Sequence, residues 1–239
     1  MIIFIALIVL TLAISGIASM LVKSRFHRGK QVPLSSGMTG AEVARLILRN
    51  KDINDVEVVE TPGFLSDHYN PGSKQLALSR DVYHGSTAAA AGVAAHEVGH
   101  AIQHAYGSWS LGMRSVLAPA AGLGSGMAPY IIFAGAILGG FQQINAGAEW
   151  GMGAYLTAAG IGLFAMFTLF TLVTVPNEYD ASAKATTVLG DLGVIRPGEE
   201  TAAVKGVLNA AALTYVAAAV TSILWLLYYV LPLLLNNRN

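Results

Sequence analysis

The chain is 239 residues long and carries 14 Lys or Arg against 14 Asp or Glu, so its formal net charge is zero. Only 12% of its residues are charged and 54% are hydrophobic, whereas about 25% of residues are charged in ordinary soluble domains. This composition excludes a disordered chain and argues against a protein that binds nucleic acid through a basic surface. The sequence has no cysteine, which excludes disulfides, cysteine-ligated zinc and a cysteine nucleophile.

Four stretches without Asp, Glu, Lys or Arg dominate the sequence: residues 1–22, 115–148, 150–177 and 206–237. A helix needs about 20 apolar residues to cross a bilayer, so each stretch is long enough for one span. The first is expected to be an uncleaved anchor, because its positive charges follow it instead of preceding it. The other spans are predicted near residues 120–141, 153–174 and 209–234.

The basic residues indicate the orientation of these spans. Residues 23–114 and 176–205 together hold 13 of the 14 Lys and Arg. With four crossings both segments lie on one side of the membrane, which the positive-inside rule assigns to the cytoplasm. We therefore expect a multi-pass protein of the cell (inner or plasma) membrane with both termini outside.

Residues 35–85 are predicted to form a small cytoplasmic α/β element. Thr39 and Glu42 have the spacing of a capping box, and an apolar helical stripe follows them. Residues 56–60 and 75–79 have the composition of short strands, and the second could accept an extended peptide as an added strand. About 50 residues bury little core alone, so this element should pack on neighbouring helices and the membrane face.

A His-Glu-Val-Gly-His sequence at residues 96–100 is the strongest chemical signal in the chain. Residues four apart on a helix share one face, so His96 and His100 can direct both imidazoles at one ion. Glu97 projects beside them, where it could take a proton from a metal-activated water. Ala-rich sequence on both sides favours a helix. The pattern therefore predicts an HExxH zinc helix with Glu97 as general base.

Catalytic zinc sites use three protein ligands, and Glu178 is the best candidate for the third. It follows Pro176 after two crossings, which return the chain to the side of His100. Two other interpretations remain open, a charge at a helix N-terminus and an ion pair with Lys184. His104 is a further candidate ligand, although an ordinary surface histidine fits its position better.

Three longer sequences resemble one known family: DHYNPGSKQLALS, HEVGHAIQ and TVPNEYDAS. Over residues 35–190 the chain resembles the putative neutral zinc metallopeptidases of bacterial membranes. More distantly it is similar to membrane zinc peptidases of the CAAX-prenyl-protease and heat-shock-protease type. That resemblance implies zinc as the metal and Glu178 as the third ligand. Those relatives have an Asp four residues after the Glu, where this chain has Ser182, whose hydroxyl could still bond a ligand imidazole.

Other polar and small residues carry weaker hypotheses. His68, Tyr69 and Tyr179 are candidates for stabilising the transition state, with packing as the alternative role. Glycines spaced four apart, Gly122 with Gly126 and Gly135 with Gly139, indicate close packing among the spans or a dimer face.

The sequence thus predicts a mainly α-helical zinc-dependent endopeptidase embedded in the membrane, acting on peptides or membrane proteins at the cytoplasmic surface, with an oligomer possible. The alternatives are a non-catalytic zinc-binding scaffold or chaperone subunit and a true intramembrane metalloprotease. The expected organisation is an anchor at 1–22, a metallopeptidase segment at 23–114, two spans at 115–177, a segment with the third ligand at 178–205 and a last span with its tail at 206–239.

Overall fold

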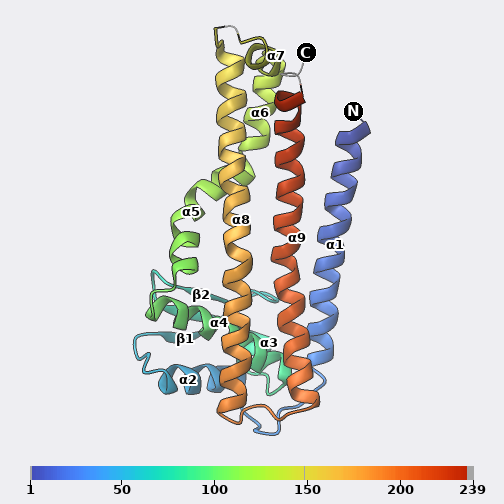
Figure 1. Cartoon of the computed structure of the whole chain (residues 1–239). Helices are drawn as coiled ribbons and strands as arrows, with labels where there is room; N and C mark the ends of the chain where they lie inside the picture. The colour runs from blue at the N-terminus through green and yellow to red at the C-terminus, as the bar shows by residue number, and fades with distance from the viewer. Residues whose placement is uncertain (1, 148, 236–239) are drawn as a thin grey trace. The chain divides into compact units, whose positions relative to one another are not determined.

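The computed structural model describes residues 2–147 and 149–235 (Figure 1). Its elements in chain order are α1 (Ile2–Gly29), α2 (Gly40–Asn50), β1 (Glu57–Thr61), β2 (His68–Asn70), β3 (Gln75–Ser79), α3 (Arg80–Tyr83), α4 (Ala88–Ala105), α5 (Trp109–Gly126), α6 (Ala128–Ile137), α7 (Gly140–Asn145), α8 (Met152–Asp191) and α9 (Glu199–Leu235). The chain divides into two compact units: unit 1 is residues 1–14, 113–174 and 216–239, and unit 2 is residues 15–112 and 175–215.

Three helices of the described chain, α1, α8 and α9, are long and apolar enough to cross a membrane. The spans predicted from 1–22, 153–174 and 209–234 fall on these helices, which extend well beyond them. α8 has 40 residues and α9 has 37, or about 60 Å and 55 Å at 1.5 Å per residue. A bilayer's hydrocarbon core is about 30 Å thick, so α8 and α9 each have room for a span and a long extension.

The remaining predicted span, near 120–141, falls on a broken helix. α5 and α6 are bent by 47° against each other and count as a fourth candidate span only if the pair is taken as one. Pro129 lies in the first turn of α6, and Gly122, Gly124 and Gly126 lie at the end of α5. Proline removes a helical hydrogen bond and glycine is a poor helix former, which explains the break.

Glycines of unit 1 allow its helices to approach closely at some positions. A Cβ added to Gly135 of α6 would lie 2.4 Å from the Thr157 Oγ1 of α8, so this glycine packs among the chain's own helices as predicted. Gly139 instead forms a turn with a φ of 74°. Around Gly122 and Gly126 the described atoms leave open space. The packing interpretation therefore holds for Gly135 and not for the other three glycines.

Unit 2 contains a three-stranded sheet in the order β1-β3-β2. β1 runs parallel to β3, with Glu57 opposite Gln75, and β2 runs antiparallel to it, with His68 opposite Ala77. Because β3 has a partner on each side, the expectation that residues 75–79 accept an added peptide strand is wrong. The sequence pattern also missed β2, which has only three residues.

The α/β element packs on α4, as expected. α2 begins with the predicted capping box: the Thr39 Oγ1 accepts from the Glu42 N–H, and the Glu42 carboxylate accepts from the Thr39 N–H. Such a cap contributes about 1 kcal/mol. The shared core is formed by side chains of the helices and of the central strand, among them Ile47, Leu76, Val98, Leu189 and Val204. This core holds α4 between the sheet and the ends of α8 and α9.

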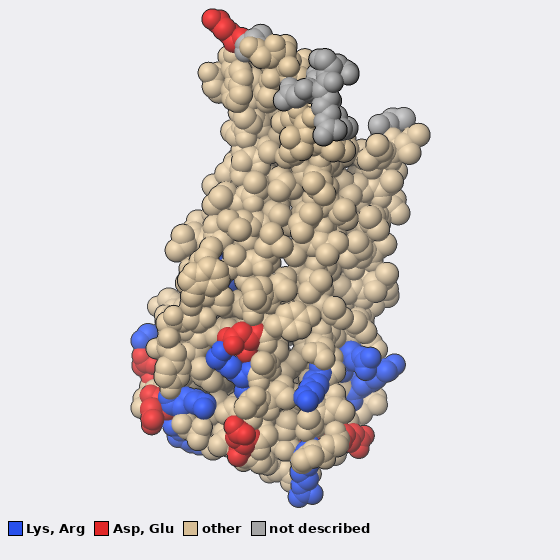
Figure 2. All heavy atoms as spheres, in the orientation of Figure 1, with Lys and Arg blue, Asp and Glu red and all other residues tan. Residues whose placement is uncertain are grey.

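Charge is confined almost entirely to unit 2. Of the 28 Lys, Arg, Asp and Glu, only Arg114, Glu149 and Arg238 fall outside residues 15–112 and 175–215, and Arg238 lies outside the described residues. In Figure 2 the blue and red spheres accordingly gather over elements of unit 2, while those of unit 1 show almost only tan. Unit 2 thus has the surface of a water-exposed structure, and unit 1 has that of a structure in lipid.

Candidate metal centre

Helix α4 presents the two histidines of the motif on one buried face. The Thr87 side chain accepts from the Ala90 N–H at its N-terminus, and alanines fill its first turns. The rings of His96 and His100 lie one turn apart, with centroids 4.8 Å from each other. Both residues are less than 10% exposed. A helix carries the motif, as the sequence predicts.

Glu178 of α8 meets these two imidazoles. Its Oε2 lies 3.1 Å from the His96 Nε2 and 3.5 Å from the His100 Nε2. The potential ligand atoms of the three residues all lie within 4.8 Å of one another. Glu178 is 1% exposed, and a buried carboxylate is costly unless positive or hydrogen-bonding groups face it. Two imidazoles and one carboxylate form the donor set of many catalytic zinc sites, so the residues present fit zinc.

The structure removes both alternative roles considered for Glu178. Pro176 lies inside α8 and does not begin a new helix, so Glu178 is not at a helix N-terminus. Lys184 pairs with Asp180 and not with Glu178. Glu178 and Lys184 both follow Pro176 on α8, which continues without a break to Asp191.

A glycine brings α4 and α8 into contact at the site. A Cβ on Gly99 would lie 2.7 Å from the Ala181 carbonyl oxygen and 3.1 Å from the Ala181 Cα. Real Cβ atoms do not approach backbone atoms so closely, so this position of α4 requires glycine. Gly99 stands between the two histidines, and Ala181 follows Glu178 by three residues. The close approach therefore places the carboxylate against the imidazoles.

The electrostatic field in the cluster favours positive charge. Burial lowers the pKa of His100, but the hydrogen bond with Glu178 and the negative charges of Glu97 and Glu178 outweigh burial and raise that pKa above its usual value. The same carboxylates would favour a divalent cation. Glu97 is 8% exposed, and within the described chain its carboxylate has no hydrogen bond or ion pair. Its lone pairs are thus available to a water or a substrate.

Polar side chains hold the outer nitrogen of each histidine. The Ser182 Oγ lies 3.1 Å from the His96 Nδ1, so the serine at the position of the expected Asp does contact the His96 imidazole. The His100 Nδ1 lies 2.8 Å from the Gln103 Oε1. Sequence reasoning missed Gln103, although it lies three residues after His100 and therefore on the same helix face. The sequence feature that could have identified Gln103 is a polar residue on the apolar face of this helix.

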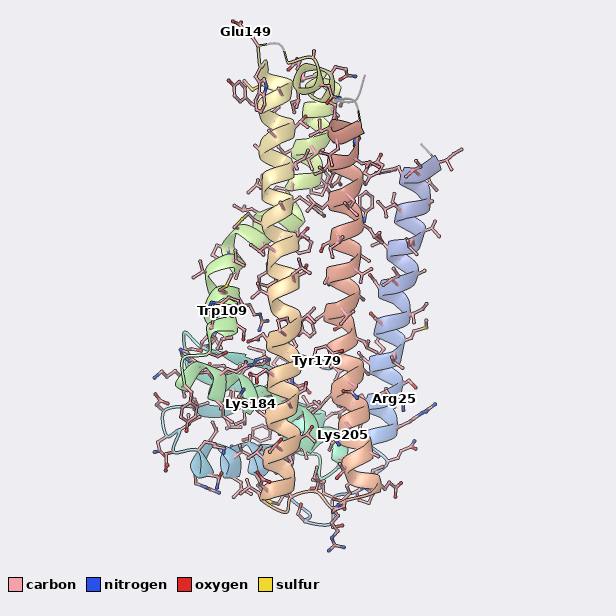
Figure 3. All side chains as sticks on the ribbon, viewed as in Figure 1. Arg25, Trp109, Glu149, Tyr179, Lys184 and Lys205 are labelled. Atoms are coloured by element: carbon pink, nitrogen blue, oxygen red, sulfur yellow. The ribbon has the colours of Figure 1, made fainter. Side chains whose placement is uncertain are left out.

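The weaker candidates are not members of the three-residue cluster. His104 is exposed, and its Nδ1 is 2.8 Å from the Tyr69 hydroxyl of β2. His68 is exposed and bonds the Ser66 carbonyl oxygen. Tyr179, labelled on α8 in Figure 3, is 43% exposed. A role of His68, Tyr69 or Tyr179 in stabilising the transition state stays a prediction.

Comparison with known proteins gives two matches. A family described as "Putative neutral zinc metallopeptidase" matches residues 3–234. The chain is also 40% identical over 236 residues to the "Putative membrane protease YugP" of Bacillus subtilis (strain 168). The matched region covers 99% of this chain and 98% of that protein. No solved structure matches the chain.

Proposed function

This chain belongs to the putative neutral zinc metallopeptidase family, and we propose that it is a zinc-dependent endopeptidase of the cell membrane. His96, His100 and Glu178 would hold the metal. The observation that carries the proposal is the convergence of these three side chains in one buried cluster, although His96 and Glu178 are 82 positions apart in the sequence. Hydrophobic packing alone does not require such a cluster.

Zinc in this position would lower the pKa of a water toward about 7 and polarise the carbonyl of the scissile peptide. Glu97 takes the proton of the attacking water and passes it to the leaving nitrogen. Its unpaired carboxylate and its place next to His96 suit it for both steps. A structural metal site needs no such base, so Glu97 favours the enzyme over the non-catalytic scaffold.

The crossing pattern that we propose has four spans, and the geometry of unit 2 supports it. His96 and Glu178 are in contact, so the end of α4 and the C-terminal part of α8 must lie on one side of the membrane. α8 crosses once between them. The α5–α6 pair must then cross as well, since otherwise α8 would place Glu178 on the opposite side from His96. With α1 and α9 this makes four.

The cluster would work at the cytoplasmic surface and not within the bilayer. Its residues belong to unit 2, which also holds nearly all charged side chains. Charged groups are costly in lipid. By the distribution of Lys and Arg, this unit would face the cytoplasm. Peptides or membrane proteins reaching the inner surface would be its substrates.

The proposal is tested with the purified full-length protein in detergent or nanodiscs. Metal content is measured by elemental analysis, and cleavage of an unstructured protein such as casein is followed before chelation, after chelation and after zinc is restored. Cleavage that disappears with the metal and returns with it is expected. A protein that binds zinc but cleaves no peptide or membrane-protein substrate would contradict the assigned activity.

A further inference from the structure

Gln103 is a buried polar residue that the proposed chemistry does not use directly. It is 1% exposed and lies on α4 one turn after His100. Its Oε1 lies 2.8 Å from the His100 Nδ1, and its Nε2 lies 2.7 Å from an Asp180 carboxylate oxygen and 2.9 Å from the Asn177 carbonyl oxygen. Asp180 in turn pairs with Lys184, which Figure 3 labels on the same helix.

These contacts allow only one orientation of the Gln103 amide. Both partners of the Nε2 are acceptors without hydrogens, so the NH₂ group must face them and donate one N–H to each. In the reversed orientation, the Oε1 would face a carboxylate and a carbonyl, and oxygen would meet oxygen twice. The Oε1 is therefore fixed toward His100, where it can only accept.

The fixed acceptor determines which nitrogen of His100 carries hydrogen. The Nδ1 must donate to the Oε1, so in the neutral imidazole the hydrogen is on Nδ1 and the lone pair is on Nε2. The Nε2 is the atom that faces Glu178 at 3.5 Å. Only a nitrogen with its lone pair free can bind a metal. The Gln103 amide thus leaves the Nε2 lone pair of the neutral His100 ring free to bind a metal ion.

Ser182 does not give His96 the same constraint. A hydroxyl can donate or accept, so its contact with the His96 Nδ1 is compatible with either tautomer. The carboxylate in this network belongs to Asp180. It accepts a hydrogen bond from the Gln103 amide, and that amide in turn bonds the His100 imidazole. Lys184 pairs with that carboxylate.

We propose that Gln103 is the positioning residue of the metal centre: it fixes the metal-binding tautomer and the ring orientation of His100, while Asp180 and the Asn177 carbonyl fix its amide. This inference rests on the proposed metal site but not on catalysis. Removing such an outer partner of a metal ligand typically lowers metal affinity about 10–100-fold.

The test compares full-length wild type with Gln103→Met, with the double variant Gln103→Glu/Asp180→Asn and with Ser182→Ala. Methionine has a similar length but only a weak acceptor for the Nδ1–H, whereas glutamate keeps a strong acceptor. The Asp180→Asn change supplies an N–H donor for the second glutamate oxygen, which would otherwise face a carboxylate. Zinc affinity is measured by competition with a chelator, Co²⁺ absorption spectra report ligand geometry, and melting temperatures are recorded with and without metal. Gln103→Met should lose about 10–100-fold in affinity and change the Co²⁺ spectrum. The double variant should lose less affinity than Gln103→Met and keep the wild-type spectrum, and Ser182→Ala should also lose less than Gln103→Met.

Other results would contradict either the role of Gln103 or the proposed function. Wild-type affinity in Gln103→Met would overturn the inference, as would a loss in the double variant as large as in Gln103→Met, or a larger loss in Ser182→Ala. If Gln103→Met does not fold, a loss of about 10–100-fold in the double variant relative to wild type would overturn it. A melting temperature that falls equally with and without metal would assign Gln103 a packing role only. Wild type that binds no metal would instead contradict the proposed function itself.

Discussion

Gly99 lies against the backbone of Ala181, and no residue with a side chain fits between the two helices at this point. The contact joins the middle of the HExxH sequence to the turn of α8 that carries Glu178. It explains why a glycine stands at the fourth residue of a motif whose chemistry requires only positions one, two and five. The close grouping of His96, His100 and Glu178 thus depends on the absence of a side chain at this position of α4.

Gly99→Ala should separate α4 from α8 and weaken the metal centre. The added Cβ would meet backbone, which cannot move aside as a flexible side chain can. We expect a loss of about 1–3 kcal/mol in stability, as for overpacked cores, together with lower metal occupancy. Thermal unfolding and elemental analysis of the purified variant measure both.

Gly92→Ala is the matched control on the same helix. A Cβ there would lie 3.4 Å from the Val204 Cγ1, which is ordinary contact, and alanine favours the helix by up to about 1 kcal/mol. This variant should keep its metal and its melting temperature. Equal damage from both substitutions would mean that the Ala181 contact is not special.

Zinc occupancy in Glu178→Ala and His104→Ala should distinguish the proposed third metal ligand from a nearby histidine that does not bind the metal. Glu178 is in the buried cluster, while His104 contacts the Tyr69 hydroxyl at the surface. Zinc occupancy should fall sharply in the first variant and remain near one per chain in the second. Dependence on His104 with no dependence on Glu178 would show that the proposed ligand set is wrong.

Glu97→Gln should separate catalysis from metal binding. Glutamine keeps the size of the side chain but cannot take a proton, and loss of a general base costs about 10²–10⁴-fold in rate. Zinc content should remain at the wild-type level. His96→Ala is the comparison, because losing one ligand should remove metal and cleavage together. Unchanged cleavage by Glu97→Gln would assign the base to another residue.

The four-span topology predicts opposite compartments for two loops. A reporter placed after Ala146 should be extracytoplasmic, and one placed near Gly193, between α8 and α9, should be cytoplasmic. An alkaline phosphatase fusion and a fluorescent-protein fusion at each position report the two sides. The same compartment for both positions is incompatible with α8 as a single crossing.

Local signals in the sequence predicted much of this structure. Residue spacing and hydropathy are enough to predict the capping box at Thr39, the helix around His96 and the charge-free parts of α1, α8 and α9. Glu178 does lie in the cluster with the two histidines, while the two crossings from which its position was inferred stay a prediction.

Other features depend on contacts that no local pattern contains. Pro176 indicated a helix start by the usual rule, yet α8 passes through it. β2 has too few residues for alternation to reveal it, and it depends on pairing with β3. The orienting role of Gln103 requires Asn177 and Asp180, more than 70 residues away in the chain. The broken α5–α6 pair also differs from the single predicted span, although the glycines and Pro129 that explain it are visible.

The cluster of His96, His100 and Glu178 also has a consequence for chain connectivity. Unit 2 is made from two stretches of sequence, and most of α5, all of α6 and α7 and the first part of α8 lie between them. A shared ion would close a ring between His96 and Glu178, which are 82 positions apart in the sequence. By the entropy estimate used for covalent cross-links, closing a ring of that size restricts the unfolded chain by about 4–5 kcal/mol. The ion would therefore join the two halves of a split unit, so losing it would loosen the chain as well as stop the chemistry.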